Sequence, residues 1–222
     1  MIVASDLGRT CPALHRLRGE GHGPSGFSYL LQRADGNFII YNGGDLKELR
    51  APIEALGGVA GIFINDRHNA KQTQVISELC AYFGAPLYAS VIEAKVPAIR
   101  ACPALSPLPF ESAILGGDFE IIPLPGHTPG NLAYLWMAPE NKILFIGDTL
   151  VHQNGEWNFW VSKPNCRTLA RGLEALVERD FDVIVSTSFG CEGGNIFSLN
   201  VASKRALFGP VMERLERKAR GT

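Results

Sequence analysis

The chain has 222 residues, of which 46% are hydrophobic and 19% are charged, and its formal net charge is −1. This composition is typical of a globular protein and excludes a disordered, collagen-like or coiled-coil chain. Because 21 Lys and Arg residues nearly balance 22 Asp and Glu residues, the chain has no overall positive field that would attract nucleic acid.

The strands are expected where short apolar segments are bounded by Gly, Pro, Asn or Asp. Ala34–Asn37 is a good hairpin turn between the first two of them. The expected strands are Phe27–Leu31, Phe38–Tyr41, Gly61–Asn65, Pro86–Ser90, Phe119–Leu124, Leu132–Met137, Lys142–Gly147 and Asp182–Thr187.

Helical spacing of apolar residues indicates helices between some of these strands. Val75, Leu79 and Phe83 recur every four residues before Gly84, which suits a helix C-terminus. A second helix follows Pro164, with an apolar stripe at Leu169, Leu173, Leu176 and Val177. We also expect a weaker helix over Asp45–Leu56, broken near Pro52, and a helical tail over residues 200–222 that Gly209-Pro210 divides into two short helices.

These elements predict an α+β fold with one domain over residues 1–222. Continuous apolar strands indicate sheets buried on both faces, with helices outside them. Residues Phe119–Gly147 contain three strands without room for crossover helices, so a single parallel sheet does not fit. We therefore predict two packed mixed sheets flanked by helices, an αββα four-layer sandwich.

The cysteines predict a reducing, cytoplasmic location. They are odd in number, lie more than twenty residues apart and form no CxxC pair: Cys11, Cys80, Cys102, Cys166 and Cys191. The chain starts without the features of a secretory signal, and no apolar run is long enough to span a membrane. We expect no membrane partner.

Three polar segments follow expected strands, where loops often carry functional residues. The first is Asn65–Lys71, in which Asp66 and His68 are two residues apart and project to the same side of an extended segment. The second is Pro125–Gly130, whose two prolines and two glycines form a rigid turn around His127. The third is Gly147-Asp148-Thr149, which places a carboxylate at a buried strand end.

The sequence Pro-Gly-His-Thr-Pro-Gly, followed about twenty residues later by an apolar strand and Gly-Asp-Thr-Leu, resembles the metallo-β-lactamase superfamily. The order of strands and helices agrees with the αββα sandwich of that family. The resemblance implies a metal-dependent hydrolase whose first metal-binding loop normally reads His-x-His-x-Asp-His.

This chain departs from that loop. Asp66 stands in place of the first His, His68 keeps the second, and Ala70 and Lys71 replace the Asp and His that hold a second metal. His127 and Asp148 match the next two ligands, and the last His would fall near Ser188. The resemblance therefore implies one divalent metal, Zn²⁺, Fe²⁺ or Mn²⁺, held by Asp66, His68, His127 and Asp148.

Two alternatives to a mononuclear site stay open at this point. In one, Lys71 replaces the missing cation and pairs with Asp148 or Asp66 in a metal-free site. In the other, the alignment shifts by one residue and places Asn65, Arg67, Asn69 and Ala70 on the ligand positions, which abolishes the site.

Several further residues are weaker candidates for the site. His22 and His152 could supply a ligand, although an exposed loop position is the simpler interpretation of each. Cys191 and Glu192 follow Ser188 in a Gly-rich loop. An aromatic cluster could line a substrate cleft or belong to the core: Trp157, Phe159 and Trp160.

Two functional hypotheses follow. The first is a hydrolase of an ester, thioester or phosphoester, in which Asp148 orients water or completes the coordination; in its metal-free variant, Lys71 is the second catalytic candidate. The second is a catalytically inactive protein that binds a small ligand or a protein partner. A homo-oligomer is left open.

The tail from Asn200 to Thr222 is locally basic, with six Lys and Arg residues against two Glu residues, a local charge of +4. A solvated helix face explains this charge, and we expect no nucleic-acid contact because no aromatic residues alternate with the charges. Binding of an acidic partner is the competing interpretation.

Overall fold

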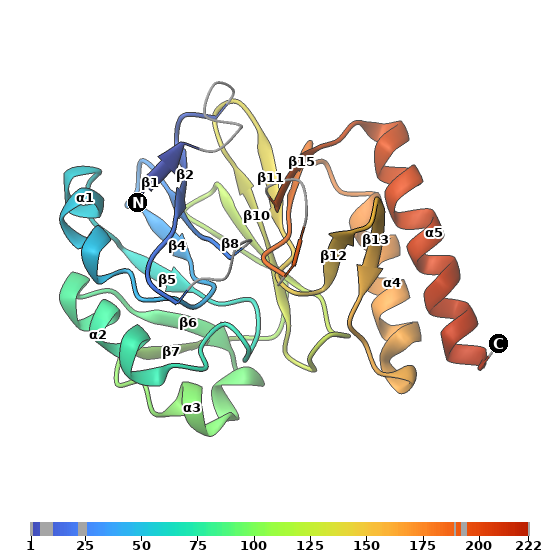
Figure 1. Ribbon diagram of the computed structural model, residues 1–222, viewed down its shortest axis with the longest axis horizontal. Coiled ribbons are helices and arrows are strands. Elements are labelled where there is room, and N and C mark those ends of the chain that lie inside the picture. Colours follow the sequence, from blue (N-terminus) through green and yellow to red (C-terminus); the bar gives the residue numbers. More distant parts are fainter. Residues whose placement is uncertain (1, 5–10, 22–25, 189, 192–194, 222) are drawn as a thin grey trace. The chain divides into compact units, whose positions relative to one another are not determined.

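The computed structural model describes residues 2–4, 11–21, 26–188, 190–191 and 195–221. The chain divides into two compact units, residues 1–110 with 138–140 and residues 111–137 with 141–222. Each unit contains its own β-sheet and its own helices (Figure 1). The expectation of a single domain over residues 1–222 stays a prediction.

The first unit contains a seven-stranded mixed sheet in the order β1-β2-β3-β4-β5-β6-β7. Strands β1 to β4 pair antiparallel, and β4 to β7 pair parallel. Its elements are β1 (Ile2–Ala4), β2 (Leu14–Leu17), β3 (Ser28–Leu31), β4 (Phe38–Ile40), η1 (Lys47–Leu49), α1 (Arg50–Ala55), β5 (Gly61–Phe63), α2 (Thr73–Phe83), β6 (Leu87–Ser90), η2 (Glu93–Lys95), α3 (Pro97–Arg100) and β7 (Leu105–Leu108).

The second unit contains a six-stranded mixed sheet in the order β15-β14-β11-β10-β9-β8 and a separate hairpin, β12-β13. Only β11 and β14 pair parallel among its described strands. Its elements are β8 (Ala113–Leu115), β9 (Phe119–Pro123), β10 (Leu132–Met137), β11 (Lys142–Phe145), β12 (Leu150–Gln153), β13 (Glu156–Phe159), η3 (Lys163–Asn165), α4 (Cys166–Val177), β14 (Val183–Val185), β15 (Ile196–Ser198) and α5 (Val201–Arg220).

All eight predicted strands are present, most of them one or two residues shorter than expected. The hairpin at Ala34–Asn37 joins β3 and β4, and Asn37 Oδ1 accepts a hydrogen bond from the backbone N–H of Arg33 at 3.2 Å. Strands β9, β10 and β11 are consecutive and antiparallel, as the lack of room for crossover helices predicted.

The core of the first unit forms between its sheet and α2. Ile76, Leu79 and Cys80 of this helix are buried in the same cluster as the sheet residues. Gly84 ends the helix in the left-handed conformation, at φ 62°, which confirms the expected C-terminus. Burial and the neighbouring Cys102 raise the pKa of the Cys80 thiol to about 12.

Helices α4 and α5 supply the helical part of the second core. The predicted apolar stripe of α4 is buried at Leu169, Leu173 and Leu176. Leu207, Phe208, Val211 and Leu215 of α5 belong to the same hydrophobic cluster. Each buried Leu, Val or Phe side chain contributes about 1.5–3 kcal/mol, so this shared cluster holds both helices on their sheet.

The expected break at Gly209-Pro210 is wrong, because α5 runs unbroken from Val201 to Arg220 with Pro210 inside it. A proline within a helix costs about 3 kcal/mol through the lost hydrogen bond and the clash with the preceding turn. The buried apolar residues before and after Pro210 offset this cost. The expected break at Pro52 is also wrong, since Pro52 lies in the first turn of α1, where no N–H is needed.

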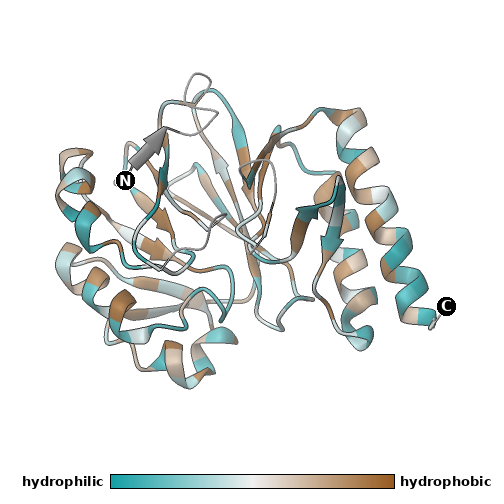
Figure 2. Cartoon of the chain, viewed as in Figure 1, coloured by the Kyte–Doolittle hydropathy of each residue, from teal (hydrophilic) through white to brown (hydrophobic). Residues whose placement is uncertain are grey.

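Both ends of α5 are closed by local capping interactions. Asn200 and Ser203 form reciprocal side-chain and backbone hydrogen bonds at its N-terminus, and Gly221 closes its C-terminus at φ 88°. Figure 2 shows the hydrophilic residues of its C-terminal half. No helix among the described residues is both long and apolar enough to cross a membrane.

Replacement of Gly172 by Ala tests the packing of α4. A Cβ at this position would lie 2.7 Å from Cδ1 of the fully buried Leu124. We expect Gly172→Ala to lower the free energy of unfolding by about 1–3 kcal/mol, despite the gain of about 1 kcal/mol that Ala brings over Gly in a helix. Urea unfolding followed by circular dichroism measures the change.

Gly209→Ala is the matched control. Outside its two chain neighbours and the nearby backbone of the helix itself, a Cβ at Gly209 would have no atom within 4 Å. Its gain in helix propensity is opposed by the ring of Pro210, which follows it in α5, so this variant is expected to change the free energy of unfolding by less than about 1 kcal/mol in dilute solution. Equal effects of the two substitutions would contradict the role assigned to the contact with Leu124.

Candidate metal-binding residues

The metal-binding side chains proposed from the sequence lie in two pairs, one in each compact unit. Asp66 and His68 follow β5 in the first unit. His127 follows β9 and Asp148 follows β11 in the second unit.

The loop after β5 is shaped by the side chain of Asn69. Its Oδ1 accepts hydrogen bonds from the backbone N–H groups of Asn65 at 3.0 Å and Asp66 at 3.1 Å. Its Nδ2 donates to Asn42 Oδ1 at 2.8 Å. Because Asn69 is buried, these bonds lack competition from water and fix the backbone that carries Asp66.

Asp66 is fully buried at 0% exposure. Its Oδ1 accepts a hydrogen bond from the backbone N–H of His68 at 2.7 Å and lies 3.3 Å from His68 Nδ1. Its Oδ2 is also buried and has no hydrogen-bond partner among the described residues. An ionised carboxylate is costly to bury without a donor or a cation, so this oxygen is chemically suited to bind a metal ion.

Arg67 lies between the two candidate ligands but turns to a different partner. Its guanidinium forms two hydrogen bonds with the Glu93 carboxylate, at 2.6 and 3.0 Å. Glu93 is only 1% exposed, and this pairing raises the pKa of Arg67. The ion pair ties the loop to η2, and the nearby charge of Asp66 raises the pKa of Arg67 further.

The loop that carries His127 is held against α4. A Cβ on Gly126, at φ 156°, would lie 2.7 Å from Leu169 Cβ, so only glycine allows this close approach. Asn131 is fully buried and donates two hydrogen bonds of 3.1 Å, to the Leu124 carbonyl and to Thr149 Oγ1. Asn131 therefore links the His127 loop to the segment that carries Asp148.

The protonation of the His127 ring follows from its partner. Its Nδ1 lies 2.7 Å from the backbone carbonyl oxygen of Trp160. A carbonyl only accepts hydrogen bonds, so Nδ1 carries the proton and the lone pair of the neutral ring is on Nε2. His127 Nε2 lies 4.0 Å from Asp148 Oδ2. A histidine held by a backbone carbonyl in this way is typical of metal ligands.

The sequence matches no family model and no curated protein, but solved structures match almost the whole chain. A metallo-β-lactamase with a HARLDQ motif from Cronobacter sakazakii is 18% identical, with a TM-score of 0.63 over 96% of this chain and 95% of its own. The metallo-β-lactamase MIM-2 is 18% identical, with a TM-score of 0.66 over 94% and 88%. A B3 metallo-β-lactamase described as having an active-site glutamic acid is 17% identical, with a TM-score of 0.63 over 100% and 96%.

The chain has the metallo-β-lactamase fold. The α+β class and the two mixed sheets flanked by helices are thereby confirmed. At these identities the likeness concerns the fold alone.

Two residues of the metallo-β-lactamase loop pattern are replaced in this chain by residues that supply no metal ligand. Ala70 is buried in the core of the first unit. Lys71 is exposed, and the ion pairs found within the described part of the chain do not include it. Its pairing with Asp148 or Asp66 and its role as a replacement for the second metal stay predictions.

The residues that the sequence offered as further candidates for the site lie in different surroundings. His152 is on β12, where its ring packs against Trp157 and Phe197, with ring centroids 5.3 and 5.1 Å away. Ser188 and Cys191 are buried, at 2% and 4% exposure. His22 and Glu192 lie outside the described residues.

The aromatic cluster proposed from the sequence has two parts. Trp157 packs edge-on against Phe197 at 4.7 Å, and Phe159 lies near the cationic groups of Arg214 and Lys218. Trp160 is 53% exposed while its carbonyl holds His127. Sequence reasoning missed Asn69, Asn131 and this carbonyl contact.

Asn131→Ala tests the link between the His127 loop and Thr149. The substitution removes both buried hydrogen bonds of the amide and leaves the Leu124 carbonyl with one donor fewer. We expect a loss of about 2–4 kcal/mol in the free energy of unfolding, measured by urea denaturation. Asn158→Ala is the control: it removes hydrogen bonds of 3.5 and 3.4 Å that its amide donates and one of 3.2 Å that it accepts from Arg214, all longer than those of Asn131. We expect it to cost less than about 1 kcal/mol, and equal costs of the two variants would contradict the role given to Asn131.

Proposed function

We propose, from their pattern in the sequence and their surroundings within each unit, that Asp66, His68, His127 and Asp148 bind one divalent metal ion and that the protein is a metal-dependent hydrolase. The observation that carries this proposal is the buried Asp66 Oδ2, which has no hydrogen-bond partner among the described residues. A cation on this oxygen would offset the cost of burying the carboxylate.

The orientation of His127 supports the same proposal. Because the Trp160 carbonyl accepts a hydrogen bond from Nδ1, the neutral ring has its lone pair on Nε2, the nitrogen that lies 4.0 Å from Asp148 Oδ2. Metal-binding histidines commonly donate their other ring N–H to a carbonyl or a carboxylate, which fixes the tautomer. His68 supplies a second imidazole and Asp148 a second carboxylate, a donor set suitable for Zn²⁺, Fe²⁺ or Mn²⁺.

One metal fits these residues better than two. Ala70 has no donor atom, and the ammonium of Lys71 repels a cation, so the loop keeps no ligand for a second ion. The substitution of Asp66 for the first histidine keeps a donor. A metallo-β-lactamase described as having an active-site glutamic acid, and another described by a HARLDQ motif, have this fold, which supports variation at the ligand positions.

When bound, such an ion supplies the Lewis acidity that activates water for attack on an ester, thioester or phosphoester. Asp148 would complete the coordination or accept a hydrogen bond from that water. The Trp160 carbonyl holds the His127 ring in one orientation, and the exposed indole of Trp160 offers a flat apolar surface for a small-molecule substrate.

A second candidate function is binding without catalysis. The exposed Lys71 and the buried Ala70 favour it, since these positions lack the ligands of a dinuclear centre. In this case the protein recognises a small ligand or a protein partner, and Lys71 supplies the positive charge that the second metal would have supplied.

We also propose a cytoplasmic location, which the buried free thiols of Cys80, Cys102 and Cys166 support.

Metal content tests the proposed site. We expect the wild-type protein, purified without chelator and supplemented with Zn²⁺, Mn²⁺ or Fe²⁺, to bind about one equivalent of metal. Asp66→Asn keeps the shape of the side chain but removes its charge, and is expected to weaken binding at least about tenfold. Elemental analysis and metal titration measure both quantities.

Lys71→Ala tests whether the site holds one metal or is a metal-free site in which Lys71 replaces the cation. If the site holds one metal, this variant is expected to bind metal as the wild type does, because Lys71 is not a ligand. Less than about a tenth of an equivalent in the supplemented wild type would contradict a mononuclear site.

A panel of chromogenic esters, thioesters and phosphodiesters tests the activity. We expect metal-dependent hydrolysis of one class, reduced at least about a hundredfold in His127→Ala. Arg205→Glu, a change on the exposed surface of α5, is the control for a loss of activity that arises during purification. Equal rates for wild type and His127→Ala would show that no catalysis occurs at this site and would favour the binding protein.

A further inference from the structure

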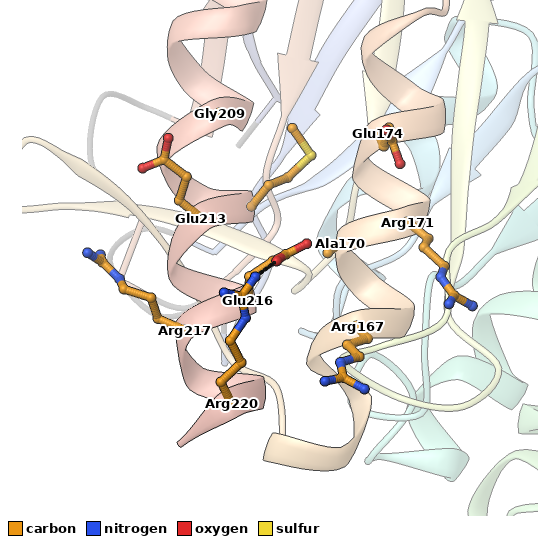
Figure 3. Close-up of a pocket in the computed structure, with 10 residues that line it drawn as sticks. Arg167, Ala170, Arg171, Glu174, Gly209, Glu213, Glu216, Arg217 and Arg220 are labelled. Carbon is orange, nitrogen blue, oxygen red and sulfur yellow. Dashed lines mark hydrogen bonds and ion pairs between the residues drawn. The ribbon is translucent and has the colours of Figure 1, made fainter. Parts of the chain in front are cut away.

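A groove with a volume of ≈ 670 Å³ runs between α4 and α5 in the second unit (Figure 3). Its half-buried floor includes Ala170 and Met212. The residues that line it recur at helical spacing on one face of each helix: Arg167, Ala170, Arg171 and Glu174 on α4, and Gly209, Met212, Glu213, Glu216, Arg217 and Arg220 on α5.

The charges in this groove are separated by sign along its length. The N-terminal part of α4 lies beside the C-terminal part of α5, so one end holds Arg167, Arg171, Arg217 and Arg220 (Figure 3). The other end holds Glu174 and Glu213. Glu216 lies in the basic end and forms an ion pair of 2.6 Å with Arg220.

Gly209 leaves this groove open along α5. It lies directly before Pro210 inside the helix, and the proline ring disfavours the helical conformation for a preceding residue that carries a Cβ. The chain itself therefore accounts for a glycine here. Apart from its two chain neighbours and the nearby backbone of the helix itself, no atom lies within 4 Å of the place that a Cβ would take, so the groove has free space at this point.

We propose that this groove is the contact surface of a symmetric dimer, in which its occupant is the same groove of a second copy. A two-fold axis through the floor, near Ala170 and Met212, reverses the groove. It places the arginine end of one copy over the glutamate end of the other, so that Glu174 and Glu213 of each copy face arginines of its partner. The gap at Gly209 admits side chains of the second copy.

The charges favour a second copy over an acidic partner. Glu174 and Glu213 would repel an acidic segment that lies along the groove. Three of the six basic side chains of the tail are also used within the unit, since Lys204, Arg214 and Lys218 donate to the backbone carbonyls of Arg179, Trp157 and Val161. These three groups keep their charge, but their hydrogen bonds hold them against the unit and away from the lining of the groove.

Sedimentation of the full-length protein over about 1–100 μM, a range that resolves micromolar dissociation constants, tests this proposal. We expect a monomer–dimer equilibrium. Glu174→Arg combined with Glu213→Arg should raise the dissociation constant at least about tenfold, because arginines then face arginines. Arg167→Glu combined with Arg217→Glu should do the same.

The variant that combines all four substitutions is the decisive one. It exchanges the positive and negative charges at both ends of the groove, which restores their complementarity and should restore the dimer. Arg205→Glu, an exposed change on α5 outside the groove, should leave the equilibrium unchanged, and circular dichroism checks that each variant is folded. A wild type that remains monomeric contradicts the proposal and leaves the groove to a different partner. The proposal is also contradicted if the dissociation constant of the dimer does not change in the two double variants, or if the fourfold variant does not restore the dimer.

Discussion

The buried carboxylate of Asp66 constrains the chemistry of this protein more than any other group. Its first oxygen accepts a backbone hydrogen bond from His68, while its second oxygen is buried without a partner among the described residues. The loop around it is held by Asn69 and by the Arg67–Glu93 ion pair, so the carboxylate cannot turn to solvent without breaking buried polar contacts. A bound cation is the simplest way to stabilise that arrangement, and the proposed function depends on it.

Much of the fold could be predicted because its inner strands are continuous apolar segments between clear turns. The strands missed by the sequence have weaker patterns. β2 contains His15 and Arg16, and β7 contains Pro107, which a strand tolerates when it lies at the edge of a sheet. The sequence misjudged α5 because Gly209-Pro210 is a strong local breaker, and the tertiary contacts of Phe208 and Val211 that outweigh it are not visible in a local pattern.

The candidate site was predictable at the level of donor atoms. Asp66, His68, His127 and Asp148 each follow a strand and match a known pattern, and their pairwise contacts within each unit agree with that interpretation. The groups that orient them were not predictable. Asn131 acts through contacts with residues up to 18 positions away, and the Trp160 carbonyl is a backbone group that any residue could supply.

A crystal structure of the protein soaked in Mn²⁺ or Zn²⁺, with anomalous scattering data, tests the central claim most directly. The account predicts one anomalous peak per chain, bound by Asp66 Oδ2, His127 Nε2, His68 and Asp148. No peak at these atoms would contradict the account, and so would two peaks, because the residues that replace the second set of ligands, Ala70 and Lys71, supply no donor for another cation.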